Sequence, residues 1–169
     1  EYLESILRSC NEIRSKKGIG KPYLLKLSPD ALDAEIRSTI SIAQGLGIDG
    51  IVATNTTIKR PIPLSTQSRK AFSSDGGLSG RPLQSRALEV INIAYDETNG
   101  KIPIVGVGGI DSKDSAWEAI ISGASLIQLY SALVFNGPTI VSSIVKGLKR
   151  RVRESGFSSI SEAVGYKHI

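Results

Sequence analysis

One lysine stands inside an apolar segment that has the character of a buried strand. The segment 23–27 reads YLLKL, and Lys26 is its one charged residue. Burying an ammonium group is costly unless an anion pairs with it. Lys26 therefore points either into a pocket, where it meets an anionic ligand, or along an exposed edge of the sheet with its amine in water.

Polar residues and glycines gather where the next strand-like segment ends. The segment 50–54 leads into Thr-Asn-Thr-Thr at 54–57, which suits ligand contact, although a turn with Asn55 in a left-handed conformation would use the same composition. Further along, 75–83 reads DGGLSGRPL, with three glycines within five positions. Such a run either lets the backbone approach a ligand closely or forms a flexible loop.

Two strand-to-helix turns have the composition of an anion site. One apolar segment runs into GVGGID at 106–111, and the next ends in YSA at 130–132. Turns of this kind offer free backbone N–H groups to an anion at the start of a helix. Two in succession form the phosphate site of a (β/α)8 barrel, at its last two strands. The pair predicts a phosphate-bearing ligand.

The elements that must position these residues alternate along the chain. Four apolar segments, dense in Ile, Val and Leu with little alternation, are typical of strands buried on both faces of a parallel sheet. They cover 23–27, 50–54, 102–107 and 125–130. Helical spacing of apolar residues marks a helix that starts near Leu3 and four others, which cover 33–46, 84–95, 112–122 and 135–154. We expect an N-cap at 111–112 and helix ends at Gly45, Gly47 and Gly123.

Four βα units allow two architectures. Strands that alternate with helices predict a parallel sheet, but four parallel strands alone leave two apolar edges open. A complete (β/α)8 barrel takes roughly 250 residues, and this chain has 169. The chain is therefore a flat doubly wound domain or one part of a larger barrel. The two phosphate-type turns favour the barrel and make these strands its last four.

Composition narrows the classes of function. The chain is 40% hydrophobic with a net charge of +5, and no apolar run approaches the roughly 18 to 20 residues that span a bilayer. A single cysteine, Cys10, and a single histidine, His168, exclude an internal disulfide, a histidine triad and a multi-histidine metal site, and we predict no metal. The basic residues of 146–153 fit a solvated helix face, and only 5% of the chain is aromatic. We therefore expect no nucleic-acid partner.

Five stretches together resemble a known family. They are 26–30, 47–57, 76–83, 103–110 and 123–132, followed by FNGP at 135–138. In order and spacing they are similar to the C-terminal half of class 2 dihydroorotate dehydrogenases, the membrane-associated, quinone-linked type. The double Thr after Asn55 and the QLY stretch at 128–130 favour class 2 over class 1. The resemblance runs over nearly the whole chain from about residue 21.

The resemblance implies a fold and a set of roles. The fold is a (β/α)8 TIM barrel to which this chain supplies about the last four βα units, so that residues 1–169 are the C-terminal half of a single FMN-binding domain. Lys26 would face the pyrimidine edge of the flavin, where a cation favours the anionic reduced form. Asn55 and Thr56 would bind the orotate ring or its carboxylate. The other residues implied to bind FMN are Thr54, Ser79, Gly80, Gly108, Gly109, Tyr130 and Ser131, the last four at its phosphate.

The reaction implied is the FMN-dependent oxidation of dihydroorotate to orotate in de novo pyrimidine biosynthesis, with ubiquinone as electron acceptor. The base would be a serine in the first half of the barrel, so no residue of this chain is expected to be catalytic, and the chain alone should be inactive. Its first partner would be that N-terminal half. The N-terminal segment of the whole enzyme, which this chain does not contain, would bind a membrane: the mitochondrial inner membrane in a eukaryote or the cytoplasmic membrane in a bacterium. We expect 58–75 to form a mobile lid over the substrate.

Three alternatives share part of this pattern. A class 1 dihydroorotate dehydrogenase, or a related FMN barrel that oxidises or reduces pyrimidines, would use fumarate or a nicotinamide in place of quinone. A phosphosugar-binding TIM-barrel isomerase or lyase would share the phosphate turns without a flavin. A noncatalytic basic module would bind nucleic acid in a salt-sensitive way.

Overall fold

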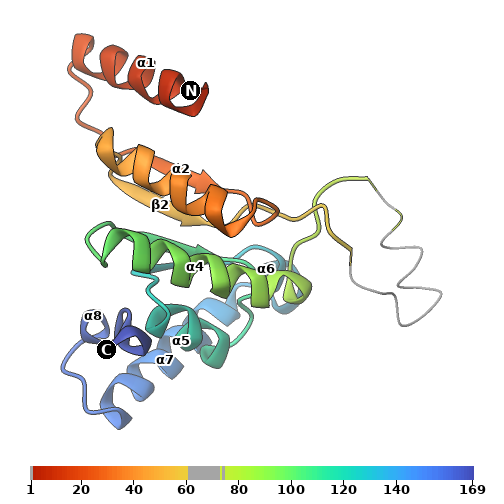
Figure 1. The fold of residues 1–169 in the computed structure, drawn as a ribbon. Helices are drawn as coiled ribbons and strands as arrows, with labels where there is room; N and C mark the ends of the chain where they lie inside the picture. Colours follow the sequence, from red (N-terminus) through yellow and green to blue (C-terminus); the bar gives the residue numbers. More distant parts are fainter. Residues whose placement is uncertain (1, 61–72, 74) are drawn as a thin grey trace.

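A computed structural model describes residues 2–60, 73 and 75–169 of the chain (Figure 1). The helices are α1 (Tyr2–Lys16), α2 (Asp33–Gly45), α4 (Gln84–Thr98), α5 (Lys113–Ile121), α6 (Ser131–Asn136), α7 (Thr139–Glu154) and α8 (Ile160–Ala163), with short 3₁₀ helices η1 (Arg81–Leu83) and η2 (Tyr166–His168). The strands are β1 (Leu24–Leu27), β2 (Gly50–Ala53), β3 (Ile104–Val107) and β4 (Leu126–Gln128). None of the helices in the described part of the chain combines the length and apolar character that crossing a bilayer requires.

The four strands form one parallel sheet in the order β1-β2-β3-β4. Each strand therefore pairs with the next one along the chain, and helices connect them, as the alternating pattern predicts. A doubly wound sheet reverses its strand order at a switch point, and this sheet does not. Sequential parallel order is the order of strands in a (β/α)8 barrel, so the topology settles the choice between the two architectures in favour of the barrel.

The two faces of the sheet differ in burial. Side chains on one face pack against α2 and α4, which lie across the strands in Figure 1. Leu27, Ile51 and Ile104 are buried there with Ile40 of α2 and Val90 of α4. This face is the core of the chain.

The opposite face is open, which corrects the expectation that every strand is buried on both sides. Its register brings together Leu24, Lys26, Val52, Val105, Val107, Leu126 and Gln128. Leu24 on β1 is 42% exposed and Leu126 on β4 is 61% exposed. The inner face of a (β/α)8 barrel is normally filled by side chains from all eight strands. Four strands alone leave it uncovered.

Local chemistry explains both ends of α5. Ser112 is the N-cap of α5, as predicted, and its hydroxyl accepts a hydrogen bond from the N–H of Ser115 at 3.1 Å. Gly123 follows α5 with φ +122 and ends it, also as predicted. Both boundaries depend only on residues within a few positions of the helix end.

The expected closing helix at 135–154 is wrong as a single element. The chain forms α6 and α7 instead, because Gly137 has φ +71 and Pro138 has no N–H to continue a helix. The chain also continues beyond Glu154 into α8, where Ala163 packs with Trp117 of α5. The strands are one to three residues shorter than expected, with β3 starting at Ile104 and β4 ending at Gln128.

Candidate functional site

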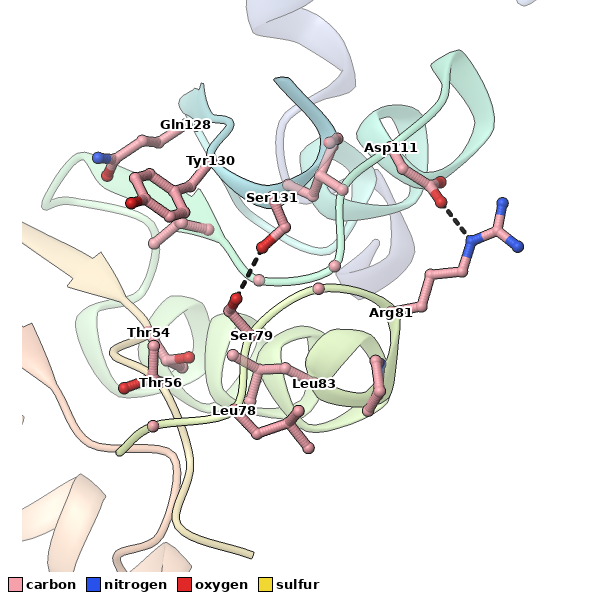
Figure 2. A pocket seen from close by; sticks show the side chains of 18 of the residues that line it. Thr54, Thr56, Leu78, Ser79, Arg81, Leu83, Asp111, Gln128, Tyr130 and Ser131 are labelled. Atoms are coloured by element: carbon pink, nitrogen blue, oxygen red, sulfur yellow. Dashed lines mark hydrogen bonds and ion pairs between the residues drawn. The ribbon is translucent and has the colours of Figure 1, made fainter. Parts of the chain in front are cut away.

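An open cavity of about 830 Å³ lies at the carboxyl ends of the four strands (Figure 2). Its size falls within the range of about 300–1,000 Å³ that is typical of small-molecule and cofactor sites. All four strands or the loops that follow them contribute to its wall. Every residue implied by the resemblance to bind ligand lines this cavity, namely Lys26, Thr54, Asn55, Thr56, Ser79, Gly80, Gly108, Gly109, Tyr130 and Ser131. Their individual roles stay predictions.

Lys26 lies on the open face of edge strand β1, and its side chain lines the cavity. No other part of the described chain covers this face of β1, and Lys26 is therefore exposed. Among the residues that the structure describes, none forms a hydrogen bond or an ion pair with its ammonium group. A cation without a protein partner at the wall of a cavity is available to an anionic or electron-rich ligand.

The polar run at 54–57 divides between the cavity and the protein interior. Thr54 is buried, and its hydroxyl donates to the backbone oxygen of Asn55 at 2.8 Å. Asn55 and Thr56 are exposed at the cavity wall, whereas Thr57 is buried and does not line the cavity. The left-handed alternative for Asn55 is wrong, because its φ is not positive.

The glycine run at 76–80 brings its backbone close to two other segments. A Cβ on Gly77 would lie 1.9 Å from Oγ1 of Thr56, so only glycine leaves room for that threonine at the cavity wall. Gly80 has φ +77 and faces Ser131. The hydroxyls of Ser79 and Ser131 form a hydrogen bond of 2.7 Å that joins two neighbouring segments of the cavity wall (Figure 2). The run therefore packs closely against two segments of the protein, whereas its approach to a ligand stays a prediction.

The turn after β3 has the geometry that the phosphate-site prediction needs. Gly108 and Gly109 have φ +137 and +69, conformations that L-residues rarely adopt. Within the described chain, the N–H groups of Gly108, Gly109 and Tyr130 donate no hydrogen bond. These donors and the hydroxyls of Ser79 and Ser131 line the same cavity. The set suits an anion with several acceptor oxygens.

Several cavity residues were missed by sequence reasoning. Gln128 ends β4 on the same face as Lys26, and both line the cavity. The sequence contains a pattern that could have identified Gln128, because it is the one polar residue of the apolar strand β4, just as Lys26 is the one polar residue of β1. Arg81 and Asp111 also line the cavity and form an ion pair with each other (Figure 2). That pairing joins residues thirty positions apart, and no local pattern indicates it.

The expected lid falls mostly outside the described residues, since 61–72 and 74 belong to it. In its described part, Arg60 donates from Nη1 to the backbone oxygens of Thr57 and Ile58, both at 3.1 Å. These bonds hold the start of the segment against the end of the polar run. The prediction of a lid is not tested by them.

Comparison with known proteins gives a consistent result. A family model described as dihydroorotate dehydrogenase matches residues 3–152. The dihydroorotate dehydrogenase (quinone) of Rippkaea orientalis is 43% identical over 99% of this chain and 45% of its own length. The corresponding protein of Natronomonas pharaonis is 44% identical over 98% of this chain and 44% of its own length. This chain thus spans less than half the length of these curated relatives.

Solved structures agree with the sequence comparison. The crystal structure of DHODH from Eimeria tenella in complex with ferulenol matches 87% of this chain with a TM-score of 0.80 and 32% sequence identity, over 38% of its own length. The ligand-free structure from the same organism matches with a TM-score of 0.79 and 33% identity. The four βα units described above therefore superpose on part of a longer chain.

Proposed function

The chain belongs to the dihydroorotate dehydrogenase family, and from that premise we propose that it forms the C-terminal half of a quinone-dependent enzyme that oxidises dihydroorotate to orotate with FMN, a step of de novo pyrimidine biosynthesis. One observation carries the proposal. Ten residues implied to bind cofactor or substrate, scattered from Lys26 to Ser131, all line a single cavity at the carboxyl edge of the sheet.

The chemistry of the cavity fits FMN. Free N–H groups at Gly108, Gly109 and Tyr130 and the hydroxyls of Ser79 and Ser131 suit its phosphate. Lys26 places a positive charge at the other side of the cavity, where it would stabilise negative charge on the flavin ring. When bound, FMN supplies a hydride acceptor. The protein contributes binding, orientation and this charge.

Asn55 and Thr56 are the proposed substrate contacts. The Asn amide both donates and accepts hydrogen bonds, and the Thr hydroxyl does the same, so the pair matches the carboxylate, carbonyl and N–H groups of dihydroorotate. Both side chains are exposed at the cavity wall. Oxidation removes one proton and one hydride from the substrate ring. We assign the proton to a serine base in the first half of the barrel, outside this chain.

The open face of the sheet supports the need for that first half. Leu24 and Leu126 lie exposed on the two edge strands, and the hydrogen-bonding edges of β1 and β4 are unpaired among the described residues. Four further strands would pair with both edges and cover this face. The chain alone should therefore not turn over dihydroorotate.

Helix α6 supports quinone as the electron acceptor. Val134 is 71% exposed and Phe135 is 85% exposed. Phe135 lines the cavity, and Val134 donates its backbone N–H to Tyr130, another residue of the cavity wall. Exposed apolar patches mark binding sites, and a quinone is an apolar ring that must approach the flavin. The quinone would take up two electrons and two protons. We assign the membrane contact to the N-terminal segment of the full-length protein. The membrane would be the mitochondrial inner membrane in a eukaryote or the cytoplasmic membrane in a bacterium.

Val134→Glu in the full-length protein should slow the reoxidation step by quinone and leave reduction by dihydroorotate unchanged. A carboxylate on α6 would have to be desolvated when an apolar quinone binds there. Stopped-flow measurement of the two half-reactions separates the effects. The matched control is Val145→Glu on α7, a valine that is 45% exposed on a helix with no residue in the cavity wall, whereas α6 contributes Phe135 to that wall. If both variants slow reoxidation equally, α6 is not the quinone surface.

The proposed function is tested by the visible spectrum of the full-length protein that contains this chain. A flavin band at about 450 nm that bleaches on addition of dihydroorotate, and returns with ubiquinone, is the expected result. A band that does not bleach would support FMN as the cofactor but exclude dihydroorotate as the substrate. A protein of intact mass without any band would favour a phosphosugar-binding barrel instead.

A further inference from the structure

We propose that Asp30 is a positioning residue for the substrate, because its carboxylate holds the segment 57–59 and thereby sets the direction in which the preceding residue, Thr56, faces the cavity. The inference rests on the proposed function, since it concerns the binding of dihydroorotate and orotate. Asp30 itself does not line the cavity. It acts through Thr57, which is buried and does not line the cavity.

Both oxygens of the Asp30 carboxylate are engaged by this segment. The hydroxyl of Thr57 donates to Oδ1 at 2.5 Å, and the backbone N–H of Ile58 donates to Oδ2 at 2.9 Å. The Thr57 hydroxyl also accepts a hydrogen bond from the N–H of Lys59 at 3.0 Å. Three consecutive residues are thus tied to one carboxylate, either directly or through Thr57.

Thr57 also determines the direction in which the side chain of Thr56 points. It pairs with Leu78 in an antiparallel bridge, with N–H to oxygen distances of 3.1 and 2.7 Å. Adjacent side chains in an extended segment point to opposite sides. Because Thr57 is turned inward to Asp30, Thr56 is turned outward to the cavity. Gly77 leaves the space that Thr56 then occupies.

The turn that carries Asp30 is itself anchored. Arg86 of α4 donates to the backbone oxygens of Pro29 at 2.9 Å and Ala31 at 3.0 Å, and it forms an ion pair with Asp33 at 2.8 Å. Arg86 therefore fixes the backbone on both sides of Asp30. A rigid turn can impose its position on the segment it binds, whereas a mobile one would only follow it.

The Asp30 carboxylate accepts the hydrogen bonds from Thr57 and Ile58 in its ionised form at neutral pH. Partial burial acts to raise the pKa of Asp30, but the hydrogen bonds from Thr57 and Ile58 and the charges of Lys59 and Arg86 outweigh it, so that the pKa lies below its ordinary value. The carboxylate is therefore ionised near neutrality, and hydrogen bonds to an ionised acceptor are stronger than neutral ones.

The test is Asp30→Asn in the full-length protein, read out by the Kd of orotate from its perturbation of the flavin spectrum. Asn keeps the size of the side chain but replaces one acceptor oxygen with an NH2 group. We expect the Kd of orotate and the KM of dihydroorotate to rise on the order of tenfold, the factor that loss of one hydrogen bond to a charged group implies. FMN content should not change.

Two further sets of variants make the test specific. Asp114→Asn removes a carboxylate that pairs with Arg151 and contacts neither the Asp30 turn nor the segment 57–59, and it should leave the Kd of orotate unchanged. Thr57→Val keeps the shape of the side chain without the hydroxyl, and it should reproduce the effect of Asp30→Asn. Thr57→Ser retains the hydroxyl and should restore most of the affinity.

The outcomes are distinguishable. Equal shifts in Asp30→Asn and Asp114→Asn, or an unchanged Kd in Thr57→Val, would overturn the positioning role. If Asp30→Asn does not fold, the Thr57→Val and Thr57→Ser pair still decides the question. Failure of the proposed function looks different, because the unmodified protein would then neither bind orotate nor bleach with dihydroorotate.

Discussion

Gly109→Ala should abolish the retention of FMN by the full-length protein. A Cβ at this position would lie 2.5 Å from Cβ, 2.8 Å from Cα and 2.9 Å from N of Gln84, the first residue of α4. Two of these atoms are backbone and cannot rotate away. Gly109 also has φ +69, which costs an L-residue about 1–2 kcal/mol, and overpacking adds about 1–3 kcal/mol. The turn must therefore shift, and its N–H donors shift with it.

We expect the affinity for FMN to fall on the order of 10²-fold or more, the factor that corresponds to these energies. The measurement is the ratio of flavin to protein after gel filtration, with circular dichroism as a check on folding. Gly45→Ala is the matched control, because a Cβ there meets nothing within 4 Å and its φ is ordinary. A folded Gly109→Ala protein that keeps its full complement of flavin would place the phosphate elsewhere.

Lys26→Ala should lower the rate of flavin reduction by dihydroorotate by about 10²-fold, the effect typical of removing one preorganised electrostatic group from an active site. Stability should change little. The side chain is exposed on the open face of β1, and no described residue pairs with it, so its removal leaves no partner unsatisfied. The charge matters only when a ligand occupies the cavity.

Stopped-flow reduction and a thermal melt measure the two quantities separately. Lys101→Ala is the control, because Lys101 is also exposed but precedes β3, at the end of the sheet away from the cavity. It should alter neither quantity. If Lys26→Ala loses reduction rate and stability in parallel, Lys26 is structural, and the electrostatic role proposed for it is wrong.

The half-barrel explains why these tests need the full-length protein. Its helix-covered face is complete, with Ile40, Ile51 and Ile104 fully buried. Its inner face and both edges remain open. A chain of this kind has a core of its own, but the cavity has walls on one side only, so the substrate would stay in water and the proton acceptor would be absent. The core therefore forms within this half of the barrel, whereas catalysis requires both halves.

The sequence alone was sufficient for features that depend on neighbouring residues. The apolar segments predicted four parallel strands, Ser112 predicted the start of α5, and the glycines at 108–109 predicted a turn with free N–H groups. The strand pattern also predicted that the polar and glycine-rich stretches meet at one edge of the sheet, because parallel strands that alternate with helices all present their carboxyl ends there. These inferences need only the local pattern and the rule of chain direction, whereas the choice of the ten candidate site residues within those stretches came from the family resemblance.

The tertiary structure decided what depends on residues far apart in the chain. Local composition does not distinguish Thr56 from Thr57, and only the family resemblance assigned Thr56 to the substrate. In the structure, the bridge to Leu78 and the carboxylate of Asp30 turn Thr57 inward and leave Thr56 at the cavity. The exposure of Lys26 follows from the position of β1 at the edge of the sheet, which its own apolar neighbours do not reveal. The physical reason is the same in both cases. Backbone propensity and chain direction are encoded within a few residues, whereas the direction of a side chain and its burial are set by contacts that exist only after distant segments have packed.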